Sequence, residues 1–397
     1  MTTSDGSVIR TTTIADHGPR ALRWNLVIMG DGYQSSQLGQ YANDVQNFVN
    51  TLQSIDPFNK MWNAINIYRI DVASTDSGAD DPTSCGGSGA SPKTYFDASF
   101  CNGGIRRALV VNDTTAIAVA NNQVPEHDMI MVIVNSTVYG GTGGSVAVFS
   151  LAPNANEIGI HEMGHTAFGF ADEYEYYAGC SSGETTHNRY TGLEPSQPNV
   201  TINTNRSSNK WHDLILASTP MPTTSNANCS QCDTQASPVS TGTVGVFEGA
   251  YYNHCGAFRP EFNCRMRALS NPFCAVCRRV IIQTLTPHLA SGLNWTFAGN
   301  TRGFGHRIND GRPFWIGNFS RSDRAQVLFY YPGDDNWWLG SVGTNNQLGW
   351  TLVGNTRGFG HGINDGRPFW IGNFSRSDRA QVLFYYPGDD NWWLGSE

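Results

Sequence analysis

Charged residues are scarce in this sequence of 397 residues, where Asp, Glu, Lys and Arg together make up 15%. The basic residues never gather in a run, and the formal net charge is −8. Because binding to nucleic-acid phosphates needs clustered Lys and Arg, we do not expect a nucleic-acid partner. Long hydrophobic runs are missing too: apolar stretches such as 129–134 are far shorter than the ~20 residues of a membrane-spanning helix. The sequence therefore predicts no membrane span.

The first seven residues have neither the basic segment nor the apolar segment of a secretory signal. The cysteine content nevertheless indicates secretion. Nine cysteines lie between Cys85 and Cys277, a density typical of oxidised, extracellular proteins. Their odd number leaves at least one thiol unpaired. We therefore expect a secreted protein with disulfides, although no signal peptide is visible.

Lysine is absent from residues 291–397, which carry nine Arg against eight Asp and one Glu and are therefore neutral. Residues 1–290 hold 16 basic and 24 acidic residues, which accounts for the whole net charge of −8. Eight of the eleven Trp also lie after residue 290. Two such different compositions predict two domains, 1–290 and 291–397.

The second predicted domain contains an internal repeat. Residues 295–341 and 350–396 align at a period of 55 and differ at only three positions. Short aromatic segments alternate with turns rich in Gly, Asn and Asp, which predicts a small all-β module of antiparallel strands. The repeats weakly resemble integrin-type propeller repeats, but two units are too few to close a propeller.

The first predicted domain begins with alternating strand and helix patterns. Continuous or alternating apolar segments predict strands, and apolar residues at three- and four-residue spacing predict helices. The strands are expected at 25–29, 65–72, 128–135 and 146–150, and the helices at 35–55, 105–121 and 154–170. The segment 264–285 closes the domain, and the spacing of its apolar residues Val276, Val280, Ile281 and Leu285 suggests a last helix. This order predicts an α/β (α+β) domain with helices packed on a mixed sheet. The glycine-rich stretch 139–144 lacks the Lys-Ser/Thr of a nucleotide-binding loop.

A His-Glu-x-x-His motif lies in the predicted helix 154–170. His161 and His165 are four residues apart and would share one helix face, where they can hold one metal ion while Glu162 reaches a water bound to it. A catalytic zinc takes three protein ligands. Gly169 can end the helix in a left-handed conformation, which would bring Asp172 back toward the metal. Glu173 is the competing third ligand.

Met266, within Cys264-Arg-Met-Arg267, is a candidate for the methionine turn that lies under the zinc in metzincins, although it could equally be an ordinary core methionine. The sequence resembles the IgA peptidase family of metallopeptidases (peptidase family M64), a metzincin-like group. The segments that carry this resemblance are 28–33, 77–80, 134–141, 161–174, 247–249, 259–260 and 264–277. It covers about residues 20–287.

The resemblance implies a secreted zinc endopeptidase with a metzincin-like catalytic domain. It also implies that the Asp-Glu-Tyr sequence at 172–174 belongs to the family pattern, with Asp172 as the oxygen ligand. Zinc lowers the pKa of a bound water, and Glu162 would act as general base in the attack on a peptide bond. Residues 146–150 are a candidate edge strand for pairing with a polypeptide substrate. Tyr174, Tyr251 and Tyr252 are candidate donors to the oxyanion.

Several other groups allow more than one interpretation. The pairs Cys229-x-x-Cys232 and Cys274-x-x-Cys277 could together form a four-cysteine zinc site, but disulfides are preferred because the protein is expected to be extracellular. His212 and His254 are interpreted as ordinary polar or core histidines rather than cleft residues.

In the repeats, calcium is a lesser alternative. The loop 317–326 places Asn318, Ser320, Ser322 and Gln326 where calcium would need mostly carboxylates. The exposed aromatic residues suit glycan or glycoprotein docking, although a structural or assembly role is preferred because aromatic-rich strands are more often part of a core. The rival to a peptidase is therefore a non-catalytic binding protein that uses these C-terminal repeats.

Overall fold

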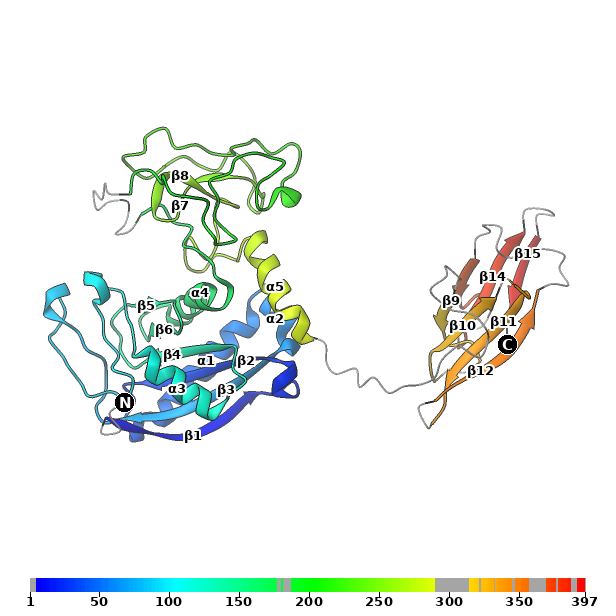
Figure 1. Cartoon of the computed structure of the whole chain (residues 1–397), viewed down its shortest axis with the longest axis horizontal. Coiled ribbons are helices and arrows are strands. Elements are labelled where there is room, and N and C mark those ends of the chain that lie inside the picture. Colours follow the sequence, from blue (N-terminus) through cyan, green and yellow to red (C-terminus); the bar gives the residue numbers. More distant parts are fainter. Residues whose placement is uncertain are drawn as a thin grey trace. The chain divides into compact units, whose positions relative to one another are not determined.

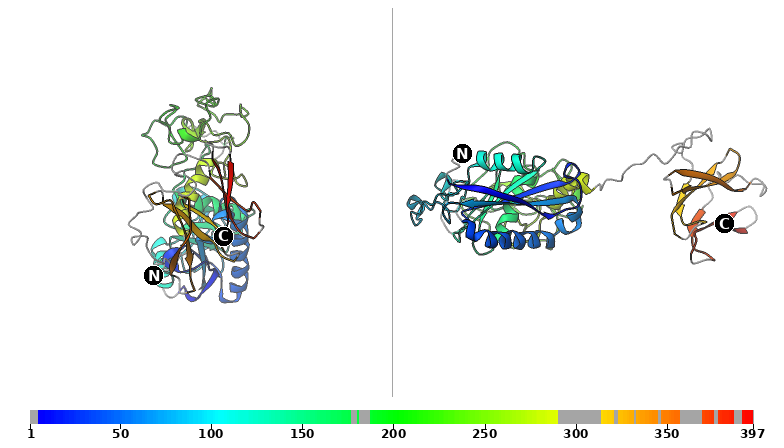
Figure 2. Two further views of the ribbon diagram at one scale, coloured as in Figure 1. Left: turned by 90° about the vertical axis from the view of Figure 1, so that its right-hand side faces the viewer. Right: turned by 90° about the horizontal axis from the view of Figure 1, so that it is seen from below.

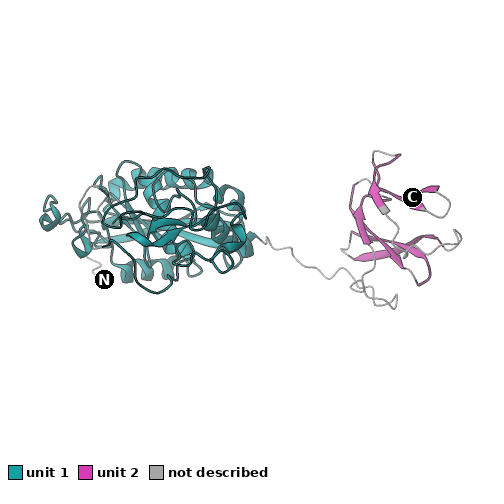
Figure 3. Cartoon of the chain, turned by 90° about the horizontal axis from the view of Figure 1, so that it is seen from above, with its two compact units in different colours: residues 1–292 teal, residues 293–397 magenta. Residues whose placement is uncertain are grey.

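The computed structural model describes residues 5–176, 180, 187–289, 314–320, 323–331, 333–344, 347–356, 369–375, 378–386 and 391–396. The chain forms two compact units, 1–292 and 293–397 (Figure 3). Among the described helices, none is long and apolar enough to span a membrane. The first part of the first repeat, 295–313, and the loop residue Ser322 lie outside the described residues.

Unit 1 is built on a six-stranded mixed sheet in the order β1-β3-β2-β4-β6-β5 (Figure 1). Strands β3, β2, β4 and β6 are parallel, whereas β1 and β5 pair antiparallel at the two ends. The strand bounds are β1 Gly6–Ala15, β2 Trp24–Asp31, β3 Ile65–Ser74, β4 Met129–Val134, β5 Gly141–Thr142 and β6 Ala147–Ser150. The expected mixed α/β fold with a mixed sheet is thus confirmed for this unit.

Helices cover both faces of this sheet, with α1 and α3 on opposite sides (Figure 2). In β4 the side chains alternate, so that Met131 packs in the core shared with α1, α4 and α5, and Val132 packs in the core shared with α3. A strand buried on both faces needs an uninterrupted apolar sequence, which Met129–Val134 supplies. The helix bounds are α1 Leu38–Ser54, α2 Phe58–Met61, α3 Asp113–Gln123, α4 Ala155–Phe168 and α5 Ala275–Leu289.

One helix begins later than the sequence pattern predicted. Helix α3 starts at Asp113, where the Asn112 side chain accepts a hydrogen bond from the Thr115 N–H and caps the first turn. The prediction of helix over 105–112 was therefore wrong, because apolar spacing alone does not mark a cap. Helix α5 starts at Ala275 and contains the apolar residues that predicted it, and Cys264 lies in a separate turn before it.

A long loop region with a single hairpin follows α4. The hairpin consists of β7 (Phe247–Ala250) and β8 (Asn253–Arg259). Disulfides join Cys180 to Cys232 and Cys229 to Cys255 in this region, and a third joins Cys85 to Cys101. The two members of Cys229-x-x-Cys232 therefore have different partners. This corrects the alternative of a zinc site shared with Cys274-x-x-Cys277.

Unit 2 contains two antiparallel sheets, ordered β12-β11-β10-β9 and β13-β14-β15. The strand bounds are β9 Phe314–Gly317, β10 Gln326–Tyr331, β11 Asn336–Val342, β12 Leu348–Asn355, β13 Phe369–Gly372, β14 Gln381–Tyr386 and β15 Asn391–Gly395. These separate β sheets agree with the expected all-β class of the tail. The first sheet takes its outer strand, β12, largely from the second sequence repeat.

In the candidate calcium loop, a glutamine supplies the bonds that hold the described residues. Gln326 Oε1 accepts from the Ser320 N–H at 2.7 Å, and its Nε2 donates to Ser341 Oγ at 2.6 Å. In the second repeat the Ser375 N–H donates to Gln381 Oε1 at 2.7 Å. These side-chain bonds close the loop in the way that a bound ion would.

Candidate active site

Helix α4 carries His161 and His165 one turn apart on the same face, and both side chains are largely buried. The helix ends at Gly169, which has φ 63° and so adopts the left-handed conformation expected of it. The Gly169 and Phe170 N–H groups donate back to His165 and Gly164 carbonyls, and the chain then reverses toward the helix. This turn brings residue 172 beside the two histidines.

Three side-chain atoms from this segment converge on one point. His161 Nε2 and His165 Nε2 are 3.2 Å apart, and Asp172 Oδ1 lies 2.9 Å from the first and 3.2 Å from the second. Ligand atoms of a tetrahedral zinc with nitrogen ligands would lie ~3.3 Å from one another. The donor set and its spacing therefore fit a single metal ion.

The other nitrogen of each imidazole has a backbone partner. His161 Nδ1 lies 3.1 Å from the Arg265 carbonyl oxygen, and His165 Nδ1 lies 2.7 Å from that of Phe170. A carbonyl only accepts, so both Nδ1 atoms carry a proton, and each Nε2 atom is left to hold either a proton or a metal ion in front of Asp172. Metal-ligating histidines are usually oriented in this way. Two imidazole nitrogens that face one carboxylate oxygen favour a positive charge between them, either protons or a metal ion.

The electrostatics of the cluster favour positive charge at that point. Burial alone would lower the pKa of His165, but the Asp172 carboxylate raises it to about 9. The pKa of His161 is also raised, because the same carboxylate outweighs the effect of burial. Conversely, burial would raise the pKa of Asp172, yet the two histidines hold it well below its ordinary value.

The second oxygen of Asp172 is fixed by a tyrosine that the sequence had offered as an oxyanion donor. The Tyr252 hydroxyl donates to Asp172 Oδ2, so Oδ1 is the oxygen that faces the histidines. Tyr251 and Tyr252 form the two-residue turn between β7 and β8, with φ 56° and 63°. Such a turn favours Asn-Gly, and bulky residues with positive φ indicate a conformation held for function.

This turn is docked on the segment that carries the aspartate. The Tyr251 N–H donates to the Asp172 carbonyl at 3.1 Å, and the Tyr252 N–H donates to the Tyr174 carbonyl at 3.0 Å. Sequence reasoning missed this positioning contact, because the two segments lie 80 residues apart in the chain. In the sequence, the pair Tyr251-Tyr252 between two short apolar segments was the only indication of this contact.

Glu162 lies in the same pocket as the three converging side chains. The pocket is lined by Ile105, Arg107, Ala108, Gly141, Thr142, Gly143, His161, Glu162, His165, Asp172, Tyr174 and Tyr252. Burial raises the pKa of Glu162, partly offset by the neighbouring histidines. Arg107 Nη2 donates to the Tyr174 hydroxyl at 3.2 Å, so a cation also lines this pocket. Arg107 was not among the residues predicted from the sequence.

Met266 is fully buried beneath helix α4. Its sulfur would lie 2.6 Å from a Cβ added to Gly164, so the thioether packs directly against the helix between the two histidines. The neighbouring Arg265 carbonyl receives the His161 bond described above. The turn with Met266 therefore supports the helix from below, and its assignment as a methionine turn stays a prediction.

Three sequence-based candidates lie outside the pocket. Glu173 is buried in a cluster with three cysteines. His212 Nδ1 lies 2.9 Å from the Asn209 carbonyl oxygen, as expected of an ordinary polar histidine. His254 is buried in β8, where its backbone N–H bonds to the His187 carbonyl, and it does not line this pocket.

The strand 146–150 is not an edge strand. Strand β6 pairs in parallel with β4 on one side and antiparallel with β5 on the other, with Val148 opposite Thr142. The prediction that a substrate pairs with it was therefore wrong. Gly141 of β5 in turn donates its N–H to the Arg107 carbonyl at 3.1 Å, so the segment around Arg107 borders the pocket.

A mixed α/β unit with a His-Glu-x-x-His helix and a converging carboxylate defines the metallopeptidase class. Residues 12–237 and 231–285 match the family model described as IgA Peptidase M64. The chain belongs to this family, whose members are metal-dependent peptidases. A comparison with curated proteins found no match.

Proposed function

We propose that this protein is a secreted, zinc-dependent endopeptidase of metzincin-like design. His161, His165 and Asp172 would hold the zinc ion, and Glu162 would act as the general base. The observation that carries the proposal is the convergence of two imidazole nitrogens and one carboxylate oxygen within 3.2 Å of one another, beside a buried glutamate.

Two nitrogens and one oxygen are a donor set that zinc uses in catalytic sites, where a fourth position stays open for water. When bound, Zn²⁺ supplies a Lewis acid and lowers the pKa of that water to near 7. The protein groups then perform the proton transfers. Glu162 accepts the proton of the attacking water and delivers it to the leaving amine, which a pKa raised by burial favours.

Two further pocket residues, Arg107 and Tyr174, would orient the substrate. Arg107 and Tyr174 border the pocket and are hydrogen-bonded to each other, so a peptide carbonyl entering beside Glu162 would meet a cation and a hydroxyl. Both can stabilise the negative charge that develops on that oxygen. We propose polypeptides as substrates and do not extend the proposal to IgA, because the pocket residues can contact any peptide bond and select no particular sequence.

The location outside the cell rests on the disulfides. Three disulfides tie the loops of unit 1, and such bonds persist in oxidising compartments. The family membership agrees with this location.

Protein cleavage by Glu162→Gln, with and without a metal chelator, tests the proposal. We expect the variant to keep its metal and to lose at least ~100-fold in kcat, since general-base catalysis contributes 10²–10⁴-fold. The exposed Glu126 offers a matched control, and Glu126→Gln should retain full activity. Cleavage that survives both chelation and Glu162→Gln would overturn the proposal.

A further inference from the structure

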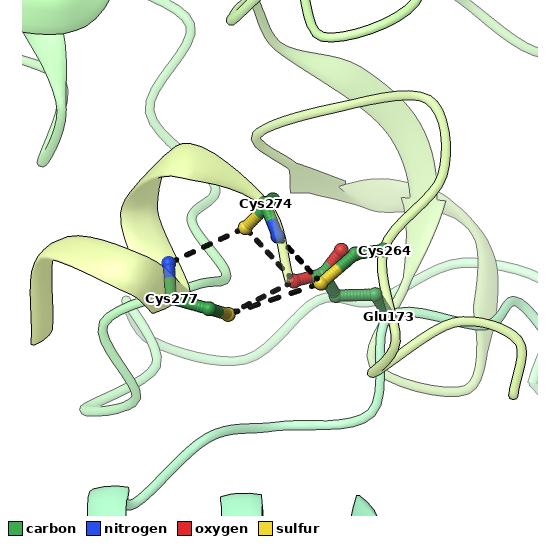
Figure 4. Close-up of side chains that lie close together, drawn as sticks. All are labelled: Glu173, Cys264, Cys274 and Cys277. Carbon is green, nitrogen blue, oxygen red and sulfur yellow. Dashed lines mark hydrogen bonds between the residues drawn. The ribbon is translucent and has the colours of Figure 1, made fainter. Parts of the chain in front are cut away.

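A second cluster of side chains that could hold a metal ion lies outside the pocket of the proposed active site. It comprises Glu173, Cys264, Cys274 and Cys277, all four fully or almost fully buried (Figure 4). Cys264 comes from the turn before Met266, Cys274 and Cys277 come from the start of helix α5, and Glu173 follows Asp172. The three cysteines are the ones that form no disulfide. Disulfides had been preferred for Cys274 and Cys277, and that expectation was wrong.

The distances within the cluster exclude a disulfide and leave room for a central ion. Cys264 Sγ and Cys277 Sγ are 3.9 Å apart, almost twice the ~2.05 Å of a disulfide. Glu173 Oε1 lies 3.8 Å from Cys274 Sγ and 3.7 Å from Cys277 Sγ. All four ligand atoms lie within 4.8 Å of one another. Sulfur ligands held ~2.3 Å from a tetrahedral zinc would be ~3.8 Å apart, so this spacing suits a central ion.

The surroundings of the cluster are also those of a metal site. The Cys274 N–H points to Cys264 Sγ at 3.3 Å, and the Cys277 N–H points to Cys274 Sγ at 3.4 Å. Such contacts stabilise thiolates at the start of a helix. Asn199 Nδ2 donates to Glu173 Oε1 at 2.9 Å and so orients the carboxylate.

A buried carboxylate needs a partner of opposite charge. Glu173 Oε2 is buried and has no hydrogen-bond partner among the described residues. Arg259 is the nearby cation that acts on this carboxylate. A metal ion held between the carboxylate and the three sulfurs would supply the positive charge that these buried groups need.

We propose that Glu173, Cys264, Cys274 and Cys277 form a structural zinc site, distinct from the cluster around His161. Three thiolates and one carboxylate occupy all four positions of a tetrahedral ion, which leaves none for a substrate or a water. A thiolate-rich, tetrahedral set selects zinc over the harder cations. The site therefore contributes to folding and positioning, not to chemistry.

The zinc site would fasten together the segments that build the active site. Glu173 is the neighbour of Asp172, and its N–H donates to the Met266 carbonyl at 2.8 Å. The Arg265 N–H donates to the Pro272 carbonyl at 3.1 Å, which joins the methionine turn to the start of α5. One ion would thus fix the aspartate, the methionine turn and helix α5 relative to one another.

The test compares metal content and thiol content in the full-length chain. In the His161→Ala/His165→Ala variant we expect one zinc ion per chain to remain and three thiols to react once the protein is denatured with chelator. In the wild type we expect two zinc ions. Cobalt exchanged into the histidine variant should give a thiolate-to-cobalt charge-transfer band, and Cys277→Ser should abolish that band. Cys85→Ser/Cys101→Ser, which removes a disulfide instead, should keep it.

The proposal would be overturned if the histidine variant contained no metal. It would also be overturned if only one thiol reacted in the denatured protein, because that result would reveal a disulfide inside the cluster. The measurement on the histidine variant stands even if Cys277→Ser fails to fold. A failure of the proposed catalytic site would appear differently, as equal metal content in the wild type and the histidine variant.

Discussion

Asp172 and Glu173 are adjacent in the chain, yet their carboxylates lie in different clusters. Asp172 Oδ1 is 2.9 Å from His161 Nε2, whereas Glu173 Oε1 is 3.7 Å from Cys277 Sγ. The two neighbouring side chains thus serve two sites through one short piece of backbone. The position of one carboxylate therefore determines the position of the other.

The first prediction separates these two carboxylates. Asp172→Ala should lose the metal of the histidine site and its peptidase activity, while the thiolate-to-cobalt band persists. Glu173→Gln should keep metal at the histidine site and weaken metal binding at the cysteine site. Metal analysis together with cobalt spectra distinguishes the variants. The same loss at the same site in both would contradict the separation.

The second prediction concerns the tyrosine that orients Asp172. Tyr252→Phe removes the hydroxyl that donates to Asp172 Oδ2, and such outer-sphere partners are worth ~10–100-fold in metal affinity. We expect a loss of that size at the histidine site, measured by competition with a chelator. Tyr251→Phe, in the same turn, leaves the Asp172 bond in place and serves as control. Equal affinities in the two variants would refute a positioning role.

The third prediction concerns the contact of Met266 with helix α4. Met266→Ala should cost about 2–5 kcal/mol of stability, as buried Met-to-Ala changes do. Gly164→Ala should cost about 1–3 kcal/mol, because the new Cβ would lie 2.6 Å from the Met266 sulfur. Gly39→Ala, where the added Cβ meets nothing within 4 Å, is the control.

The double variant tests whether the two residues share one contact. With Met266 shortened, the Cβ at position 164 has room, so the combined loss measured by urea denaturation should be about 0.5–3 kcal/mol smaller than the sum. Strict additivity would show that the methionine does not press on the helix.

The fourth prediction is a pH dependence away from both proposed metal sites. Burial would raise the pKa of Glu194, but hydrogen bonds from Thr201 and the Ile202 N–H, together with Lys210, lower it below its ordinary value. A lowered folded-state pKa contributes stability above the unfolded-state pKa, and this contribution is lost as the pH falls through the folded-state pKa.

Because the Glu194 side chain is 39% exposed, its contribution is modest. Glu194→Gln should be less stable than the wild type by about 1 kcal/mol near neutral pH, and the difference should shrink at an acid pH below the ordinary pKa of a glutamate. Urea denaturation at the two pH values measures it, with Glu126→Gln as the exposed control. A difference that persists at low pH would show that another effect dominates.

Much of the fold of unit 1 was predictable because its central strands are buried on both faces. The apolar run at 129–134 and the spacing from Tyr41 to Leu52 leave little choice of element. Strand β1 was missed because it is rich in threonine and half exposed, which blurs the apolar pattern. The hairpin β7–β8 was missed because its turn is Tyr-Tyr, where sequence rules look for Asn-Gly.

The active-site helix was predictable because its functional residues lie within one local pattern of helix, glycine and aspartate. The cysteine cluster was not, since Glu173 comes 101 residues before Cys274 and 104 before Cys277. In a protein expected to be extracellular, a Cys-x-x-Cys pair favours disulfides, and that preference was wrong for Cys274 and Cys277. Only the fold brings the third thiol and the carboxylate to this pair.

Strand β12 shows that the two sequence repeats of unit 2 are not separate folding units. It runs from Leu348 to Asn355, mostly inside the second repeat, yet it pairs with β11 of the first. The boundary between the two sequence repeats and the boundary between the two sheets therefore differ by one strand. A cut made at the sequence boundary would divide a sheet, and each further copy would lend its opening strand to the copy before it.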